Sequence, residues 1–85
     1  MQLSLLETFR AVVEKGTTQA AAEALGLSQS GVSRRIAQLE EELGIPLFVR
    51  DRGRLIPTRE NRLLQGQIVG LVEHGARLTQ RAGEL

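Results

Sequence analysis

A short stretch in the middle of the chain carries hydrogen-bonding side chains at helical spacing. On a helix that begins after Ser28, the outer face of the first turns would present Gln29, Ser30, Ser33 and Arg34, with Gln38 one turn further along. Glutamine can pair bidentately with adenine and arginine with guanine, while serine bonds a base or a phosphate. A helix that reads duplex DNA contacts bases with residues near its N-terminus. The pattern therefore predicts a DNA-recognition helix over about residues 29–43.

An arginine cluster follows this helix. Arg50, Arg52 and Arg54 surround the turn signal Asp51-Arg52-Gly53, which separates the short apolar runs 47–50 and 54–57. Two such runs predict a β-hairpin, whose second strand Pro57 limits to a sheet edge. Arginine at the tip of a hairpin can enter a narrow minor groove. The alternative interpretation is a solubilising loop, and the hairpin's position after the recognition helix favours the DNA contact.

Two further helices precede the recognition helix. Ser4 and Glu7 have capping-box spacing, which predicts a first helix over about 5–15. Thr17 or Thr18 is expected to cap a short second helix, over about 19–25, that Gly26 ends. The connection to the third helix is then so short that the pair has the layout of a helix-turn-helix. An ordinary helical corner is the alternative, and the polar outer face of the third helix favours the helix-turn-helix.

The apolar residues of the third helix define its buried face. Val32, Ile36, Leu39 and Leu43 form one stripe, and Gly44 and Pro46 end the helix. The acidic run 40–42 lies at the far end of the helix, where we expect a hydrated face or pairing with the hairpin arginines.

A long final helix is expected from the cap Thr58 to about residue 81. Apolar and small residues recur in it at alternating steps of four and three, at Leu64, Ile68, Leu71, Gly75 and Leu78. Such a heptad-like seam predicts pairing with a second copy of the chain. The alternative is that the helix packs only on its own domain.

Composition excludes several classes of protein. The 85 residues suffice for one small domain, and the absence of cysteine excludes disulfide scaffolds and cysteine metal sites. Only two rings, Phe9 and Phe48, argue against base stacking on an aromatic platform. The single histidine, His74, has no catalytic or metal-binding partner at motif spacing, so we expect no enzyme activity, no metal and no cofactor. No membrane span or signal peptide is evident, which makes the cytoplasm the expected location.

The runs AAEALGLSQSGVSRRI (21–36) and LEEELGIPLF (39–48), with Arg50 two residues on, resemble the N-terminal domain of LysR-type transcriptional regulators. The resemblance covers about residues 3–80. It implies a mainly α winged helix-turn-helix, with a three-helix core and a hairpin wing, over residues 1–57. It also implies a linker helix over 58–85 that forms a homodimer, and binding to an inverted repeat in double-stranded promoter DNA.

The resemblance also assigns roles to individual residues. The recognition-helix and wing contacts match Gln29, Ser30, Ser33, Arg34, Arg50, Arg52 and Arg54, with further DNA-contacting positions at Thr18 and Gln19. Five positions depart from the family's usual residues: Thr18, Gln19, Ser30, Gly31 and Asn61. Family members usually carry an effector-binding domain after the linker helix, and this chain stops where that domain would begin. Any small-molecule effector is therefore expected to act through a domain outside this chain.

One rival from another class remains. The same winged helix could bind a protein rather than DNA, because a fold does not fix a function. A protein-binding version would more naturally expose apolar residues on the outer face of the third helix. That face is polar here, and the hairpin is rich in arginine, so DNA is favoured.

Overall fold

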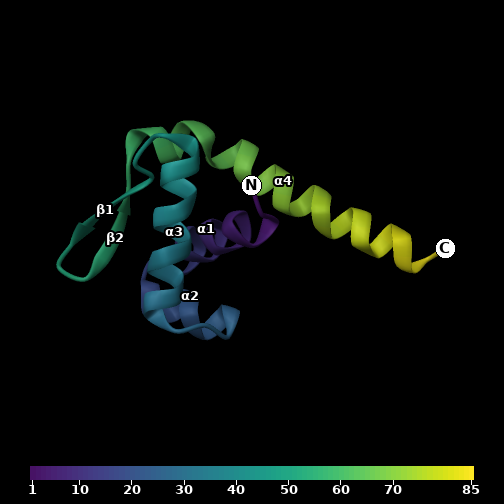
Figure 1. Cartoon of the computed structure of the whole chain (residues 1–85), viewed down its shortest axis with the longest axis horizontal. Helices are drawn as coiled ribbons and strands as arrows, with labels where there is room; N and C mark the ends of the chain where they lie inside the picture. The colour runs from purple at the N-terminus through teal and green to yellow at the C-terminus, as the bar shows by residue number, and fades with distance from the viewer.

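Six elements follow one another along the chain, and the computed structural model describes all residues 1–85. They are α1 (Leu3–Lys15), α2 (Thr18–Leu25), α3 (Gln29–Leu43), β1 (Phe48–Asp51), β2 (Arg54–Pro57) and α4 (Arg59–Gly83). Helices α1 to α3 and the hairpin form a head, from which α4 projects to one side (Figure 1). The chain is accordingly elongated, measuring 47 × 26 × 19 Å along its principal axes. This is the predicted mainly α winged helix-turn-helix with a long final helix.

Side-chain caps begin three of the four helices. The hydroxyls of Thr17, Ser28 and Thr58 accept hydrogen bonds from backbone amides in the first turns of α2, α3 and α4. Each satisfies a donor that has no partner within its helix. Thr17 is thus the cap of α2, and the predicted caps of α3 and α4 are confirmed.

The predicted capping box of the first helix is wrong. Helix α1 begins at Leu3, its N-cap Gln2 makes no side-chain cap, and the carbonyl of Gln2 accepts the amide of Leu5. Leu5 and Leu6 are buried in the first turn, so the helix has to start before them. Ser4 is therefore already helical, and its carbonyl accepts the hydroxyl of Thr8 at 2.7 Å.

The helix-turn-helix is held by small and apolar residues where α2 meets α3. Ala22 and Val32 are 4% and 0% exposed, and Gly26 adopts the left-handed φ of 67° that lets the chain turn after α2. The core continues into α1 through Phe9, whose ring lies 5.7 Å from that of Phe48 in β1. This aromatic contact ties the hairpin to the helical head.

The hairpin turns on two residues. Its register pairs Phe48 with Pro57 and Asp51 with Arg54, which leaves Arg52 and Gly53 as the loop. Both adopt positive φ, 52° and 79°, as the type I′ turns that suit two-residue hairpins require. Leu55 from β2 and Phe48 from β1 are buried, so one side of the hairpin rests on the head.

Helix α4 has a buried half and an exposed half. Asn61, Ile68 and Val72 are buried in the part of α4 up to residue 72, and α4 packs on α1. From residue 76 onward every residue is exposed, and the helix ends at Gly83, two residues beyond the predicted end. No helix in the chain combines the length and apolarity needed to cross a membrane.

Candidate nucleic-acid interface

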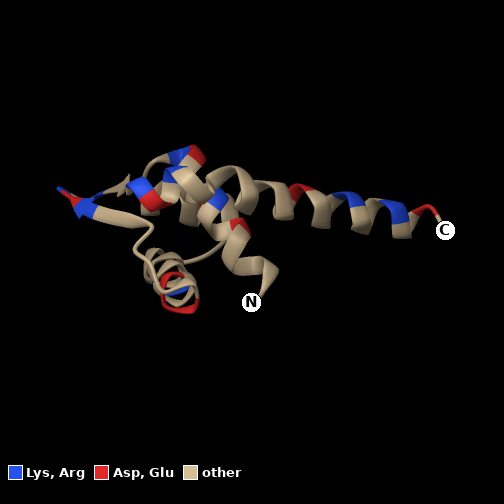
Figure 2. Cartoon of the chain, turned by 90° about the horizontal axis from the view of Figure 1, so that it is seen from above, with Lys and Arg blue, Asp and Glu red and all other residues tan.

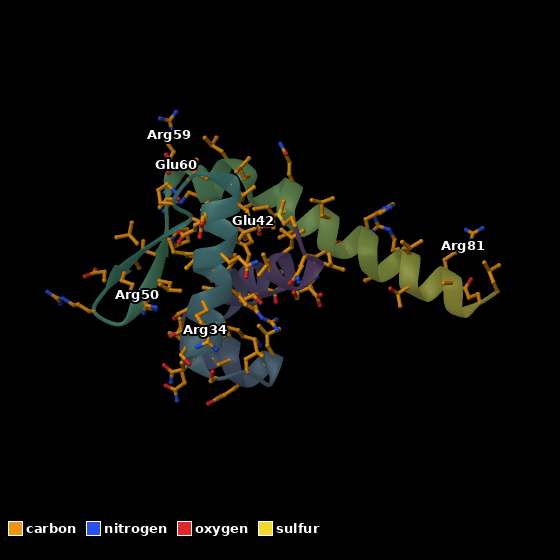
Figure 3. The ribbon with its side chains drawn as sticks, viewed as in Figure 1. Arg34, Glu42, Arg50, Arg59, Glu60 and Arg81 are labelled. Carbon is orange, nitrogen blue, oxygen red and sulfur yellow. The ribbon has the colours of Figure 1, made fainter.

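The outer face of α3 is polar because its opposite face is committed to the core. Val32 and Leu39 are fully buried and Ile36 is 5% exposed. The helix therefore directs Gln29, Ser30, Arg34 and Gln38 outward, and all four are exposed, while Ser33 on the flank is half-buried. Figure 3 shows the Arg34 side chain on the N-terminal half of α3. The predicted recognition residues thus share one accessible face.

The N-terminus of α3 adds hydrogen-bonding capacity to this face. The Ser28 hydroxyl accepts the amide of Gly31 at 3.0 Å and lies 3.2 Å from the hydroxyl of Ser30. The remaining amides of the first turn and the positive end of the helix dipole are suited to a phosphate. The first turn of α3 can therefore hold a DNA backbone beside the side chains that are predicted to read bases.

The wing arginines form a second cationic group. Arg50, Arg52 and Arg54 are all exposed, with Arg52 in the turn itself. Figure 2 shows the hairpin's basic residues at the end of the molecule opposite to the C-terminus. In Figure 1 the turn extends toward the same end of the molecule as the N-terminus of α3. Both predicted DNA-contacting elements are therefore positioned for one extended ligand.

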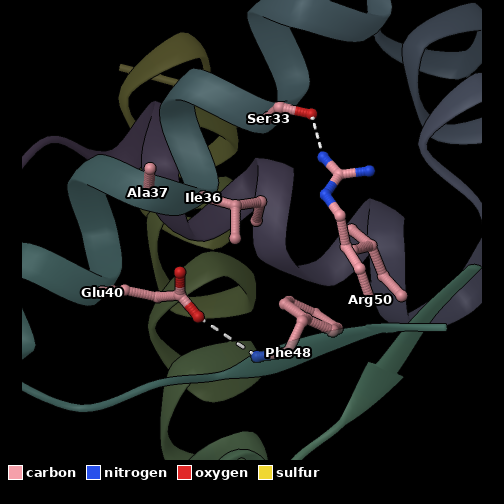
Figure 4. A pocket seen from close by; sticks show the side chains of 7 residues that line it. Ser33, Ile36, Ala37, Glu40, Phe48 and Arg50 are labelled. Carbon is pink, nitrogen blue, oxygen red and sulfur yellow. Dashed lines mark hydrogen bonds between the residues drawn. The ribbon is translucent and has the colours of Figure 1, made fainter. Parts of the chain in front are cut away.

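A shallow groove separates α3 from the hairpin, and polar bonds cross it (Figure 4). The Arg50 guanidinium donates from Nη2 to Oγ of Ser33 at 2.7 Å. Towards the other end, the carboxylate of Glu40 accepts the amides of Leu47 at 2.6 Å and Phe48 at 3.2 Å. These bonds join the recognition helix directly to the strand that carries the wing arginines.

Glu40 is a positioning residue that sequence reasoning did not identify. Of the two alternatives for the acidic run 40–42, a hydrated face or pairing with the hairpin arginines, the structure shows no such pairing. Glu40 instead accepts hydrogen bonds from backbone amides. Glu41 and Glu42 are exposed, and the one ion pair in the chain joins Arg10 to Glu14. The Leu47 and Phe48 amides lie where the chain enters the hairpin, and a carboxylate makes strong bonds to such donors.

A second polar junction fixes the hairpin to α4. Asn61 is fully buried, and its side-chain amide donates to the carbonyl of Leu47 at 2.8 Å. The Thr58 hydroxyl donates to the carbonyl of Pro46 at 2.8 Å. The segment just before β1 is therefore held from α3 by Glu40 and from α4 by Thr58 and Asn61. Asn61 was visible in the sequence only as a departure from the family's usual residue.

The two candidate DNA contacts in α2 differ. Gln19 is exposed, but Thr18 is only 6% exposed. Since Thr17 caps the helix, the helical phase directs Thr18, Ala21 and Ala22 into the core. The structure therefore places Thr18 in the core and leaves little of it accessible for the predicted DNA contact.

The heptad residues of α4 fall into two groups. Ile68 is 5% exposed in the chain's own core, and Leu64 packs against that core. A Cβ on Gly75 would lie 3.0 Å from Cδ2 of Leu3, so this glycine allows close approach of the chain's own α1. Leu71 and Leu78, by contrast, are 53% and 65% exposed. Only these two of the five predicted seam residues present large free apolar side chains.

The fold and the site define a class of protein. A helix-turn-helix with a polar outer face, followed by an arginine-bearing hairpin and a long helix, is a winged helix-turn-helix module. The family model described as "Bacterial regulatory helix-turn-helix protein, lysR family" matches residues 3–62. The chain belongs to the LysR family.

Individual relatives agree with this placement. The chain is 52% identical over 59 residues to a probable HTH-type transcriptional regulator, LrrA, of Synechococcus elongatus, covering 69% of this chain and 20% of that protein. Among solved structures, the BenM DNA-binding domain in complex with benA site 1 DNA is 32% identical, with a TM-score of 0.87 over 99% of this chain and 94% of that one. A CbnR DNA-binding domain–DNA complex is 28% identical, with a TM-score of 0.89 over 99% and 97%. The chain spans between 20% and 27% of the length of the curated relatives it matches.

Proposed function

We propose that this chain binds double-stranded DNA sequence-specifically, as the DNA-binding part of a bacterial LysR-type transcriptional regulator. The observation that carries the proposal is the accessible polar face of α3, braced against an arginine-bearing hairpin. The N-terminal half of α3 lies in the major groove and reads bases through Gln29, Ser30, Ser33 and Arg34, with Gln38 nearby. The wing places Arg52 and Arg54 at the adjacent backbone and minor groove.

The relatives support this assignment. They are transcriptional regulators by name, and the two solved domains that match nearly the whole chain are complexes with DNA. We propose the same ligand for this chain, with no enzymatic step, and hence the bacterial cytoplasm as its location. The rival, a winged helix that binds protein, is disfavoured because the outer face of α3 carries no large apolar side chain.

We propose different roles for the winged helix-turn-helix and for α4. Residues 1–57 make the DNA contacts, and residues 58–85 form the linker helix, whose first half also completes the core. The exposed Leu71 and Leu78 pair two copies of the chain on an inverted repeat. Any effector acts through a further domain of the whole regulator.

Selection from a random duplex pool tests the DNA proposal. We expect wild-type protein to enrich an imperfect inverted repeat whose half-sites lie about one helical turn apart, because a twofold dimer reads two half-sites on one side of the duplex. Enrichment of no sequence, together with no binding at low salt, would move the assignment to the protein-binding rival.

Leu71→Glu tests the linker assignment. A charge within an apolar seam should abolish dimers in analytical ultracentrifugation and weaken binding to the inverted repeat far more than to a single half-site. Leu63→Glu is the matched control, since Leu63 is 67% exposed but lies outside the heptad spacing. A wild-type chain that stays monomeric at high concentration would contradict the dimer.

A further inference from the structure

The hydrogen bond between Arg50 and Ser33 joins two side chains that are both predicted to touch DNA. Arginine has no acceptor, so its Nη2 is the donor and the serine oxygen, 2.7 Å away, is the acceptor. Arg50 is exposed and Ser33 half-buried. The bond therefore lies at the accessible edge of the groove between α3 and the wing, where a ligand on the face of α3 would meet it (Figure 4).

The bond with Arg50 determines which hydrogen-bonding groups of Ser33 remain free for a ligand. A serine hydroxyl offers one hydrogen and two lone pairs, and Arg50 occupies one lone pair. A serine inside a helix often donates its hydrogen to the carbonyl four residues earlier. Ser33 makes no such bond here, and the contact with Arg50 is its one side-chain hydrogen bond in the structure. Its hydroxyl hydrogen is free, and the neighbouring positive charge disfavours the approach of a further donor.

We propose that Arg50 is a specificity-determining residue that acts through Ser33, so that the two side chains together present donors to one base. Guanine is the base that fits, because its major-groove edge offers two adjacent acceptors, O6 and N7. Adenine offers a donor beside its acceptor, and cytosine offers a donor, so each meets a mismatched group. The proposal rests on the proposed function and adds to it the base that this part of α3 reads.

The assignment gives Arg50 a role different from that of the other wing arginines. Arg52 lies in the turn and Arg54 on β2, and neither forms a side-chain bond to α3 in this structure. We expect these two arginines to contact the DNA backbone or the minor groove. Loss of a backbone contact lowers affinity on all sequences alike, and loss of a minor-groove contact lowers it most where the flanks are A·T-rich. Loss of Arg50 should instead alter the preference at one position of the site.

The test compares binding of single-base variants of the selected duplex by the full chain and its variants. Wild type should prefer guanine at one position per half-site by roughly tenfold or more. Ser33→Ala and Arg50→Met should each reduce that preference to within about threefold at the same position. The double variant should lose no more than either single one, because the two side chains act as a unit. Arg54→Met is the matched control and should lower affinity by one factor on every duplex.

Two results would contradict the role proposed for Arg50, and a third would contradict the proposed DNA-binding function on which that role rests. If Arg50→Met weakens all duplexes equally and reduces the salt slope by about one, Arg50 is a phosphate contact. If Ser33→Ala leaves every base preference intact, the pair does not read a base. If wild type itself selects no sequence, the proposed function fails and this assignment fails with it. Thermal unfolding of each variant separates these results from loss of fold, and we expect each variant to remain folded.

Discussion

The two elements that form the candidate interface, α3 and the hairpin, are held in place by different kinds of interaction. Helix α3 is oriented by its apolar stripe, with Val32 and Leu39 fully buried in the head. The hairpin buries Phe48 and Leu55, but its position also depends on polar bonds from Glu40, Thr58 and Asn61. An apolar stripe repeats at helical spacing and can be recognised in a sequence. Hydrogen bonds from side chains to backbone groups produce no periodic pattern in the sequence. The orientation of the recognition helix can therefore be predicted from the sequence, whereas the position of the wing becomes clear only in the structure.

Glu40→Ala should have the largest effect and tests whether polar bonds hold the wing in place. It leaves the amides of Leu47 and Phe48 without their carboxylate acceptor, which should lower the free energy of unfolding by about 2–3 kcal/mol. Urea unfolding measures the loss. The matched control is Glu42→Ala, since Glu42 is exposed and forms no bond to the hairpin, and it should change stability by less than about 0.5 kcal/mol. Equal effects of the two variants would mean that the carboxylate of Glu40 does not help to hold the wing.

Arg34→Ala tests the recognition-helix side of the comparison. Loss of one bidentate side chain should weaken binding to the selected site by about 1–3 kcal/mol and relax the preference at one base. Stability should stay unchanged, because Arg34 is exposed and makes no hydrogen bond within the chain. Fluorescence anisotropy against single-base variants measures both quantities, with Arg81→Ala, at the far end of α4, as the control (Figure 3). An equal loss on all sequences would identify Arg34 as a phosphate contact.

Arg52→Ala should have the smallest effect and sharpens the role of the wing. A single arginine near a minor groove should contribute about 1 kcal/mol or less, and most where the groove is narrow. We therefore expect weaker binding chiefly to duplexes whose flanks are A·T-rich. Titration of matched duplexes with A·T-rich and G·C-rich flanks measures the difference. Indifference to the flanks would remove the minor-groove assignment.

The same contrast explains how much the sequence could predict. The third helix was predicted with its observed bounds, and both strands to within one residue, because caps, stripes and turn residues are local signals. The first helix was misjudged because Ser4 has the spacing of a cap while burial of Leu5 and Leu6 sets the start. At the start of this helix the capping spacing and the burial of apolar residues favour different first residues, and burial determines the observed one.

The candidate site shows the same limit. The exposed residues of α3 and the three wing arginines could be named from spacing, whereas the bond between Arg50 and Ser33 crosses 17 positions of sequence. The heptad spacing of α4 can be seen in the sequence. The sequence does not show that Ile68 is buried in the chain's own core or that Gly75 lies against Leu3 of α1. A helix that packs on its own core and also presents a second apolar surface carries two overlapping apolar stripes. Spacing alone does not show to which stripe a residue belongs.

A salt titration of binding to the selected duplex and to a scrambled duplex of the same composition tests directly whether α3 reads bases. Each phosphate contact adds about 0.9 to the slope of log affinity against log salt, so both duplexes should lose affinity steeply. We expect the selected duplex to stay bound at least about a thousandfold more tightly at physiological salt, because base contacts add to the phosphate contacts. Equal affinities for the two duplexes across the titration would contradict base reading by α3.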